Sequence, residues 1–532
     1  MKTAEEIVAG RFRTAPEDYY QGPLKQAPSQ KDFYTYLFMD NKIYSLLMLF
    51  LMLCEFIIFK LMYPYPDFFS DSYSYIFAAY AHLDVNIWPI GYSKFLLLFH
   101  WFTHSATALN YFQFLFLGVA ALYFYHTIVY FYPTGKTTRT ILCLFLFFNP
   151  LNLYLANYVT SDAIFIGLSL FWLSEMIWIL NRPRLSQVFI QAIIFFIAFT
   201  FRYNAMYYPL IGAVVFLLSR QKAWVKALGI VLGPLLIIPF ILFSSNAAKK
   251  MTGTAQFPPI LGGWQWGNNA LYMREYIHPD TTQFPTLQTA ELDQLARNFY
   301  RNTPPEQRQL SAYVANFFIR QPNAPLKQYM SRHYQPKDGV EDVAAWGKVA
   351  PVFGQYGLYL VKKYPLAYFQ HYMLVNAVNY FLPPLEKLEV YNLGTDEMWP
   401  IAQYWFSYPS PKVTCISKTL QGTLLYLFTS FFMILNIYGA IAFYLFVRRG
   451  GLRKSDKYFR YTVLAVGLFL LLNAGFSIFA NIIVIRYEVF PMIVFLTFTM
   501  LLTDWLELTY RSRKQTSTTV PIQIPANILN KI

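Results

Sequence analysis

Long runs of apolar residues recur along the chain and are separated by short polar segments. A run of about 17 or more such residues lets a helix cross a bilayer, and a helix also satisfies its own backbone polar groups there. The short alternating segments of a membrane β-barrel are absent from the sequence. The pattern therefore predicts an all-α polytopic membrane protein with about ten spans. The predicted spans are residues 43–63, 107–132, 140–158, 163–180, 186–201, 204–219, 223–243, 419–447, 461–485 and 489–505.

Two segments interrupt the series of spans. Residues 64–106 contain two short apolar stretches, 72–82 and 92–104, which are too short to cross and are expected to lie flat at the membrane surface. Residues 244–418 are polar, rich in proline and long enough for a folded domain, which we expect to be mixed but mostly helical. The predicted parts are a cytoplasmic N-terminal segment (1–42), a seven-span catalytic module (43–243), an extracytoplasmic soluble domain (244–418), a three-span segment (419–506) and a cytoplasmic tail (507–532).

Basic residues occupy every second connection between the predicted spans. Cytoplasmic loops carry an excess of lysine and arginine, so this alternation places both termini in the cytoplasm and residues 244–418 outside it. The basic connections hold Lys136, Arg139, Arg182, Arg184, Arg220, Lys222, Lys226, Arg448, Arg449, Arg453, Lys454, Lys457, Arg460, Arg511, Arg513 and Lys514, and the opposite ones hold Asp67, Asp71, Asp84 and Asp162.

The composition supports a membrane protein. Hydrophobic residues make up 56% of the chain and charged residues 13%, about half the usual globular share. A net charge of +15 often indicates a nucleic-acid partner, but here the basic residues lie between apolar runs, so the predicted partner is the lipid bilayer. The three cysteines form no disulfide framework, and the first apolar run is long enough to span rather than be cleaved as a signal. We expect a bacterial inner-membrane protein.

Two other features of the sequence, the pair His100 and His104 and the acid Glu55, could indicate function but also have structural explanations. His100 and His104 are four residues apart, as on a zincin helix, but Trp101 stands where the catalytic glutamate would follow, which favours interfacial packing. Glu55 lies deep in the first predicted span. It is either a functional group or a structural one, protonated or paired with another helix.

Four charged residues from distant parts of the chain fall on one side of the membrane. Asp71 follows the first span, Asp162 precedes the span 163–180, and Arg202 and Arg486 stand at outer span ends. A carboxylate there can serve as a general base. Arginine binds phosphate in a bidentate manner, and a departing phosphate needs charge stabilisation. The alternative is that the acids cap helices and the arginines snorkel to headgroups.

These residues resemble the motifs of the GT-C superfamily of glycosyltransferases, in the branch that holds the protein O-mannosyltransferases and the aminoarabinose transferase of lipid A. Members of that branch carry a catalytic Asp in the first outer loop with a Tyr a few residues on, as Asp71 and Tyr75 stand here. The similarity extends through residues 43–245 and then only to Arg486-Tyr487. Matching features are Asp71, Tyr75, Pro89-Ile90-Gly91-Tyr92 and Asp162.

The resemblance implies a GT-C-like fold and a hexosyl or pentosyl transferase. Such an enzyme moves a sugar from a polyprenyl-phosphate donor to a glycan, lipid or protein acceptor outside the cytoplasm, with inversion. It also implies roles for individual residues. Asp71 is the base, Tyr75 supports it, Asp162 orients a substrate, and Arg202, Arg486 and Tyr487 bind the donor phosphate.

Two departures from the family pattern matter. Many relatives carry paired acids in the first loop, whereas Ser72 follows Asp71 here, so we expect no required cofactor and do not favour a divalent metal. The stretch 262–269 is rich in glycine and tryptophan. It is either an acceptor loop formed by Trp264, Trp266 and Asn269 or a turn packed by its own tryptophans.

Two other function classes stay open. A transporter or lipid flippase is the main alternative, but transporters usually show internal repeats and broken helices in matching positions, and no two-fold repeat is evident here. A non-catalytic assembly protein would use residues 244–418 for docking.

Overall fold

A computed structural model describes residues 30–307, 316–335 and 339–518. Within these residues the structure consists of helices and two isolated β-bridges, and it contains no strand. Eight of the helices are long and apolar enough to cross a membrane, so the predicted α-helical membrane protein is confirmed at this level. Most of the N-terminal segment and the end of the tail, residues 1–29 and 519–532, lie outside the described part.

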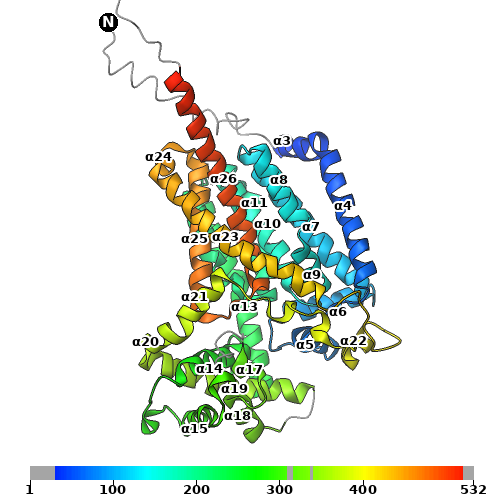
Figure 1. Cartoon of the computed structure of the whole chain (residues 1–532), viewed down its shortest axis with the longest axis vertical. Coiled ribbons are helices and arrows are strands. Elements are labelled where there is room, and N and C mark those ends of the chain that lie inside the picture. The colour runs from blue at the N-terminus through cyan, green and yellow to red at the C-terminus, as the bar shows by residue number, and fades with distance from the viewer. Residues whose placement is uncertain (1–29, 308–315, 336–338, 519–532) are drawn as a thin grey trace, which may run out of the picture.

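The spans form a bundle with the helices of the soluble domain at one end and α3 and the end of α26 at the other (Figure 1). Two further predicted spans are shorter apolar helices, α11 (Leu185–Phe201) and the pair η3 (Tyr203–Tyr207) and α12 (Tyr208–Leu218). The long helices are α4 (Lys42–Met62), α7 (Ala106–Phe131), α8 (Lys136–Phe147) with α9 (Pro150–Asn157), α10 (Asp162–Asn181), α13 (Ala223–Thr252), α23 (Leu420–Arg448), α25 (Lys457–Ala480) and α26 (Ile485–Thr518).

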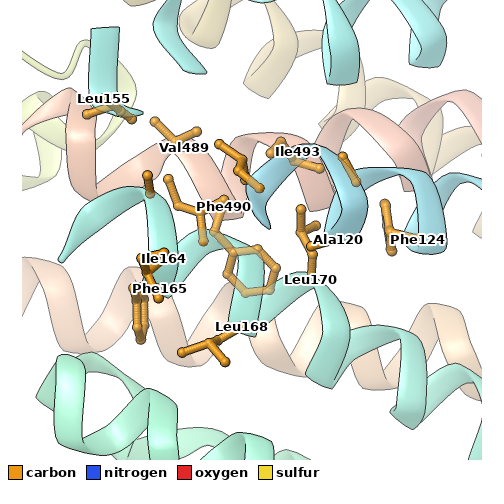
Figure 2. Close-up of a cluster of buried hydrophobic side chains, with 14 of the residues drawn as sticks. Ala120, Phe124, Leu155, Ile164, Phe165, Leu168, Leu170, Val489, Phe490 and Ile493 are labelled. Atoms are coloured by element: carbon orange, nitrogen blue, oxygen red, sulfur yellow. The ribbon is translucent and has the colours of Figure 1, made fainter. Parts of the chain in front are cut away.

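Helix α10 is the centre of the bundle. Of its most apolar stretch 94% is buried, against 17% for α13 at the periphery. Hydropathy does not explain this difference, because α13 is at least as apolar as α10; the packing of α10 against α7, α11 and α26 places it inside the bundle. Figure 2 shows Ile164 and Leu170 of α10 in one buried cluster with Ala120 of α7 and Phe490 of α26. This packing fixes the start of α10, where Asp162 stands.

The predicted span 140–158 is two helices. Proline lacks a backbone N–H and disfavours a helical residue before it. Accordingly Asn149 is extended, its side chain accepts a hydrogen bond from the Leu151 N–H, and Pro150 begins α9. The Asn-Pro pair therefore breaks the segment although its hydropathy is continuous.

The junction of the last two spans also differs from the prediction. Helix α25 ends at Ala480 and α26 begins at Ile485, whereas the apolar pattern predicted a span as far as 485 and a new one from 489. The turn contains the buried residues Ile482 and Val484, so hydropathy does not reveal it. Arg486 consequently lies in the first turn of α26 instead of in a connection.

The polar segment 244–418, called the insert below, has two parts, and the first has its own hydrophobic core. Helix α13 runs past the predicted span end at 243 to Thr252 and leads into this part. Trp264, Tyr356 and Tyr329 are among its buried side chains. Asp293 at its centre accepts hydrogen bonds from Arg274 and other neighbours, so the buried charge is compensated. The helices are α14 (Leu261–Arg274), α15 (Leu287–Asn302), α17 (Phe317–Arg320), α18 (Pro325–His333) and α19 (Val340–Lys363).

The rest of the insert returns to the bundle. Leu385, Leu388 and Tyr391 belong to the same hydrophobic cluster as the spans. This second part also packs on α5, one of the two short helices in residues 64–106, through contacts such as that of Tyr73 with Trp399. The two short helices of residues 64–106 are α5 (Ser70–Tyr80) and α6 (Gly91–His100). The second part of residues 244–418 contains α20 (Pro365–Tyr368), η5 (Phe369–Met373), α21 (Leu374–Phe381), η6 (Glu386–Leu388), η7 (Tyr391–Gly394) and α22 (Pro400–Trp405).

Candidate functional site

A cavity of about 310 Å³ lies where the spans meet α14 and the connection formed by residues 64–106. Side chains of α5, α10, α26 and the residues after α11 line it, so elements far apart in sequence share one pocket. The structure brings together all the residues expected to be catalytic or to bind the donor phosphate, namely Asp71, Tyr75, Asp162, Arg202, Arg486 and Tyr487.

Asp71 stands in the first turn of α5, where the helix dipole favours a negative charge. Its side chain is buried, with one oxygen 2.8 Å from Lys387 Nζ and the other 3.0 Å from Arg486 Nη2. Burial by itself would raise the pKa of this carboxyl, but the ammonium and guanidinium groups outweigh it and hold the pKa below its ordinary value. Asp71 is therefore a carboxylate at neutral pH.

Asp162 completes a chain of alternating charges. Arg202 donates to one of its oxygens, and the Thr160 hydroxyl donates to the other at 2.9 Å. Arg486 Nη1 lies 3.5 Å from the same second oxygen. Arg486 thus bridges Asp71 and Asp162, and both arginines that bind the acids line the cavity.

The ring of Tyr487 packs against both arginines. The guanidinium carbon of Arg202 is 4.3 Å from the ring centroid and that of Arg486 is 4.7 Å away, both within cation–π range. The Arg486 Nε–H, although buried, has no hydrogen-bond acceptor among the described residues. A buried donor without a partner is costly, so this atom is suited to an anionic ligand.

Tyr75 lines the cavity but does not touch the base directly. Its hydroxyl pairs with Ser161 Oγ at 3.2 Å, next to Asp162. The expected support for Asp71 is therefore not a hydrogen bond in this structure.

Asp67 lies four residues before Asp71 and stands apart from the cavity. Its carboxylate accepts the Asn392 N–H at 2.8 Å. Burial raises the pKa of Asp67 to about 7, since no cation compensates the buried charge. The two acids of one loop thus differ in environment, and only Asp71 lines the cavity.

The stretch 262–269 is helical, so both interpretations of it, an acceptor loop or a turn packed by its own tryptophans, are wrong in local structure. Residues 262–269 belong to α14, which packs closely on α19. Trp264 is buried and stacks on Trp346 at 4.1 Å, away from the cavity. Asn269 donates to the Ala480 carbonyl, and of the three proposed acceptor residues only Trp266 lines the cavity.

Lys387 is the site residue that the sequence did not reveal. It comes 316 residues after Asp71 in a segment that was expected to belong to the soluble domain. The available signal was its place between Leu385 and Leu388, which are buried in the bundle cluster. A lysine between two leucines is too common a pattern to identify a site.

The acids of the site are paired with cationic side chains in this structure. Both oxygens of Asp71 are occupied by cations, and Asp162 is engaged by two arginines. Among the described residues, no group of three or more His, Cys, Asp or Glu side chains is arranged to hold an ion.

The remaining cavity wall is aromatic and amide-rich, with Trp88, Trp266, Asn204, Gln265 and Asn481 among the lining residues. Aromatic rings with a few polar groups are typical of small-ligand sites. No family model, curated protein or solved structure matches this chain.

Proposed function

We propose that this protein is a GT-C-type glycosyltransferase that moves a sugar from a polyprenyl-phosphate donor to an acceptor on the extracytoplasmic side of the membrane. The observation that carries the proposal is the meeting of Asp71, Arg202 and Arg486 in one cavity at the end of the spans. An ionised acid beside two guanidinium groups provides a base and a phosphate site within one pocket.

The donor phosphate would bind between Arg202 and Arg486. Both side chains are held by ring and carboxylate contacts, so little conformational freedom is lost when the phosphate arrives. The unpaired Arg486 Nε–H would donate to one phosphate oxygen. The apolar wall of the cavity, which includes Met206 and Phe476, suits the adjoining part of the lipid.

The transfer needs one proton acceptor and one leaving group. The acceptor oxygen attacks the anomeric carbon as Asp71 takes its proton. The bond from that carbon to the phosphate oxygen breaks, and the phosphate leaves with the electron pair. Attack opposite to the leaving group inverts the anomeric configuration. Arg202 and Arg486 stabilise the charge that develops on the phosphate.

Donor binding would also prepare the base. Arg486 is shared between Asp71 and the proposed phosphate position. As the negative phosphate binds this guanidinium and offsets its charge, the field on Asp71 weakens and its carboxylate becomes more basic. The base would therefore be strongest when the donor is in place.

The test uses the purified full chain in lipid nanodiscs with a panel of polyprenyl-phosphate sugars and with glycan, lipid and peptide acceptors, read by mass spectrometry. The Asp71→Asn variant should lose transfer by about 10²–10⁴-fold, the usual contribution of a general base. Asp67→Asn is the matched control, since it lies in the same loop outside the cavity and keeps the oxygen that accepts the Asn392 N–H. Parental transfer by folded Asp71→Asn would overturn the proposal.

A further inference from the structure

The helical segment 365–381, made of α20, η5 and α21, has an apolar outer face. Leu366, Leu374, Val378 and Phe381 are exposed on it, with exposed fractions of 48–66%. The spacing of eight, four and three residues follows one side of a helix. A row of large apolar side chains on one helix face indicates a surface that contacts an apolar partner.

The inner face of the same segment is fixed to the end of α25. Tyr368 donates to the Phe479 carbonyl and Tyr372 to the Asn481 carbonyl, at 2.5 and 3.1 Å. The last carbonyls of a helix have no partners within the helix, so these bonds satisfy the end of α25. The outer face is therefore held in one orientation.

The apolar row continues the surface that the spans expose. Helix α21 packs on α23 and α25, whose exposed residues include Leu427 and Ile434 on α23 and Leu471 on α25. In Figure 1, α21 leads from the bundle toward α20 beside the soluble domain. Apolar side chains on α23 and α25 are the surface that contacts lipid in a membrane protein, and α21 extends this surface.

We propose that the segment 365–381 is a membrane-inserted helix whose outer face lies among the acyl chains of the leaflet on the domain side. Lys362, exposed just before the segment, is placed to reach anionic headgroups. The segment lies inside the insert that the sequence assigned to water, so the boundary of the soluble domain falls before it. This inference rests on the lipid-facing surface of the spans and is independent of the transferase proposal.

Site-directed spin labelling of the full chain tests the proposal. With Cys54, Cys143 and Cys415 replaced by serine, one cysteine is introduced at Val378 and labelled in vesicles of phosphatidylethanolamine and phosphatidylglycerol. Leu471→Cys on α25 is the lipid reference. Leu287→Cys is the water reference, because this residue is 91% exposed at the start of α15 in the soluble domain.

The label at Val378 should collide with oxygen several-fold more often than with a water-soluble nickel chelate, as the label at Leu471 does. A label at Val378 that behaves like the one at Leu287 would overturn the proposal. Protection from both reagents would also overturn it, and would indicate that a second protein copy covers this face.

Discussion

Asp71 is a buried acid that remains charged because two cations compensate it. The same contacts stabilise the folded chain and tune the proposed base. Since its pKa lies below the ordinary value of 3.8, its ion pairs stabilise the fold at pH values above 3.8, and this contribution is lost as the pH falls through the lower pKa of the folded state. Asp67 has the opposite shift, so its burial costs stability as the pH rises through about 7.

Lys387→Met should make transfer more sensitive to acid. Removal of the ammonium group raises the pKa of Asp71, so the base becomes protonated at a higher pH. The acid limb of the kcat/KM profile therefore shifts to higher pH. The measurement is kcat/KM against pH. Lys348→Met, at an exposed position on α19, is the control and should leave the profile unchanged.

An unchanged acid limb in Lys387→Met would mean that protonation of Asp71 does not govern the rate. A loss of activity that is equal at every pH would point to a structural role for Lys387 alone.

At the scale of elements, hydropathy predicted where helices occur better than where they end. Three helix ends depend on contacts or backbone chemistry that hydropathy averaged over a window does not detect. They are the break at Pro150, the apolar turn before Ile485 and the extension of α13 to Thr252. The stretch 262–269 shows the same limit. Its glycines suggested a turn, but they let α14 approach α19 closely.

Gly263→Ala should destabilise the soluble domain. A Cβ at residue 263 would lie 1.9 Å from the Ala350 carbonyl oxygen, and because this contact involves the backbone of α19, a whole helix must shift. Overpacking of this kind costs about 1–3 kcal/mol, so the melting temperature in detergent should fall by several degrees.

Gly475→Ala in α25 is the matched control. A Cβ there meets nothing within 4 Å, and alanine is the better helix former by about 1 kcal/mol, so the melting temperature should stay the same or rise. Equal melting of both variants would show that α14 and α19 do not need this close approach.

At the scale of the whole molecule, the soluble domain lies at one end of the bundle (Figure 1), and the cavity lies at the same end because residues of α14 line it. The proposed chemistry requires this end to face away from the cytoplasm, in agreement with the basic connections at the other end. The charge pattern predicts this orientation, and the proposed transfer depends on it.

Cysteine labelling in intact cells tests this orientation. In a cysteine-free background, Leu287→Cys in the domain should react with a membrane-impermeant maleimide. Arg449→Cys, in the exposed connection after α23, should react only after permeabilisation. The reverse pattern would place the domain in the cytoplasm and remove the basis for an extracytoplasmic acceptor.

The order of apolar and polar residues by itself determined the membrane class, the approximate positions of the spans, the presence of Asp162, Arg202 and Arg486 at span ends, and the position of Asp71 in the loop after the first span. These properties are local, because burial in lipid depends on composition over about 20 residues. Only the tertiary structure decided that Lys387 compensates Asp71, that α14 is a helix packed through glycine, and that the segment 365–381 has an apolar outer face joined to the spans. Each of these depends on which distant surfaces pack together, and that is set by the complete set of contacts.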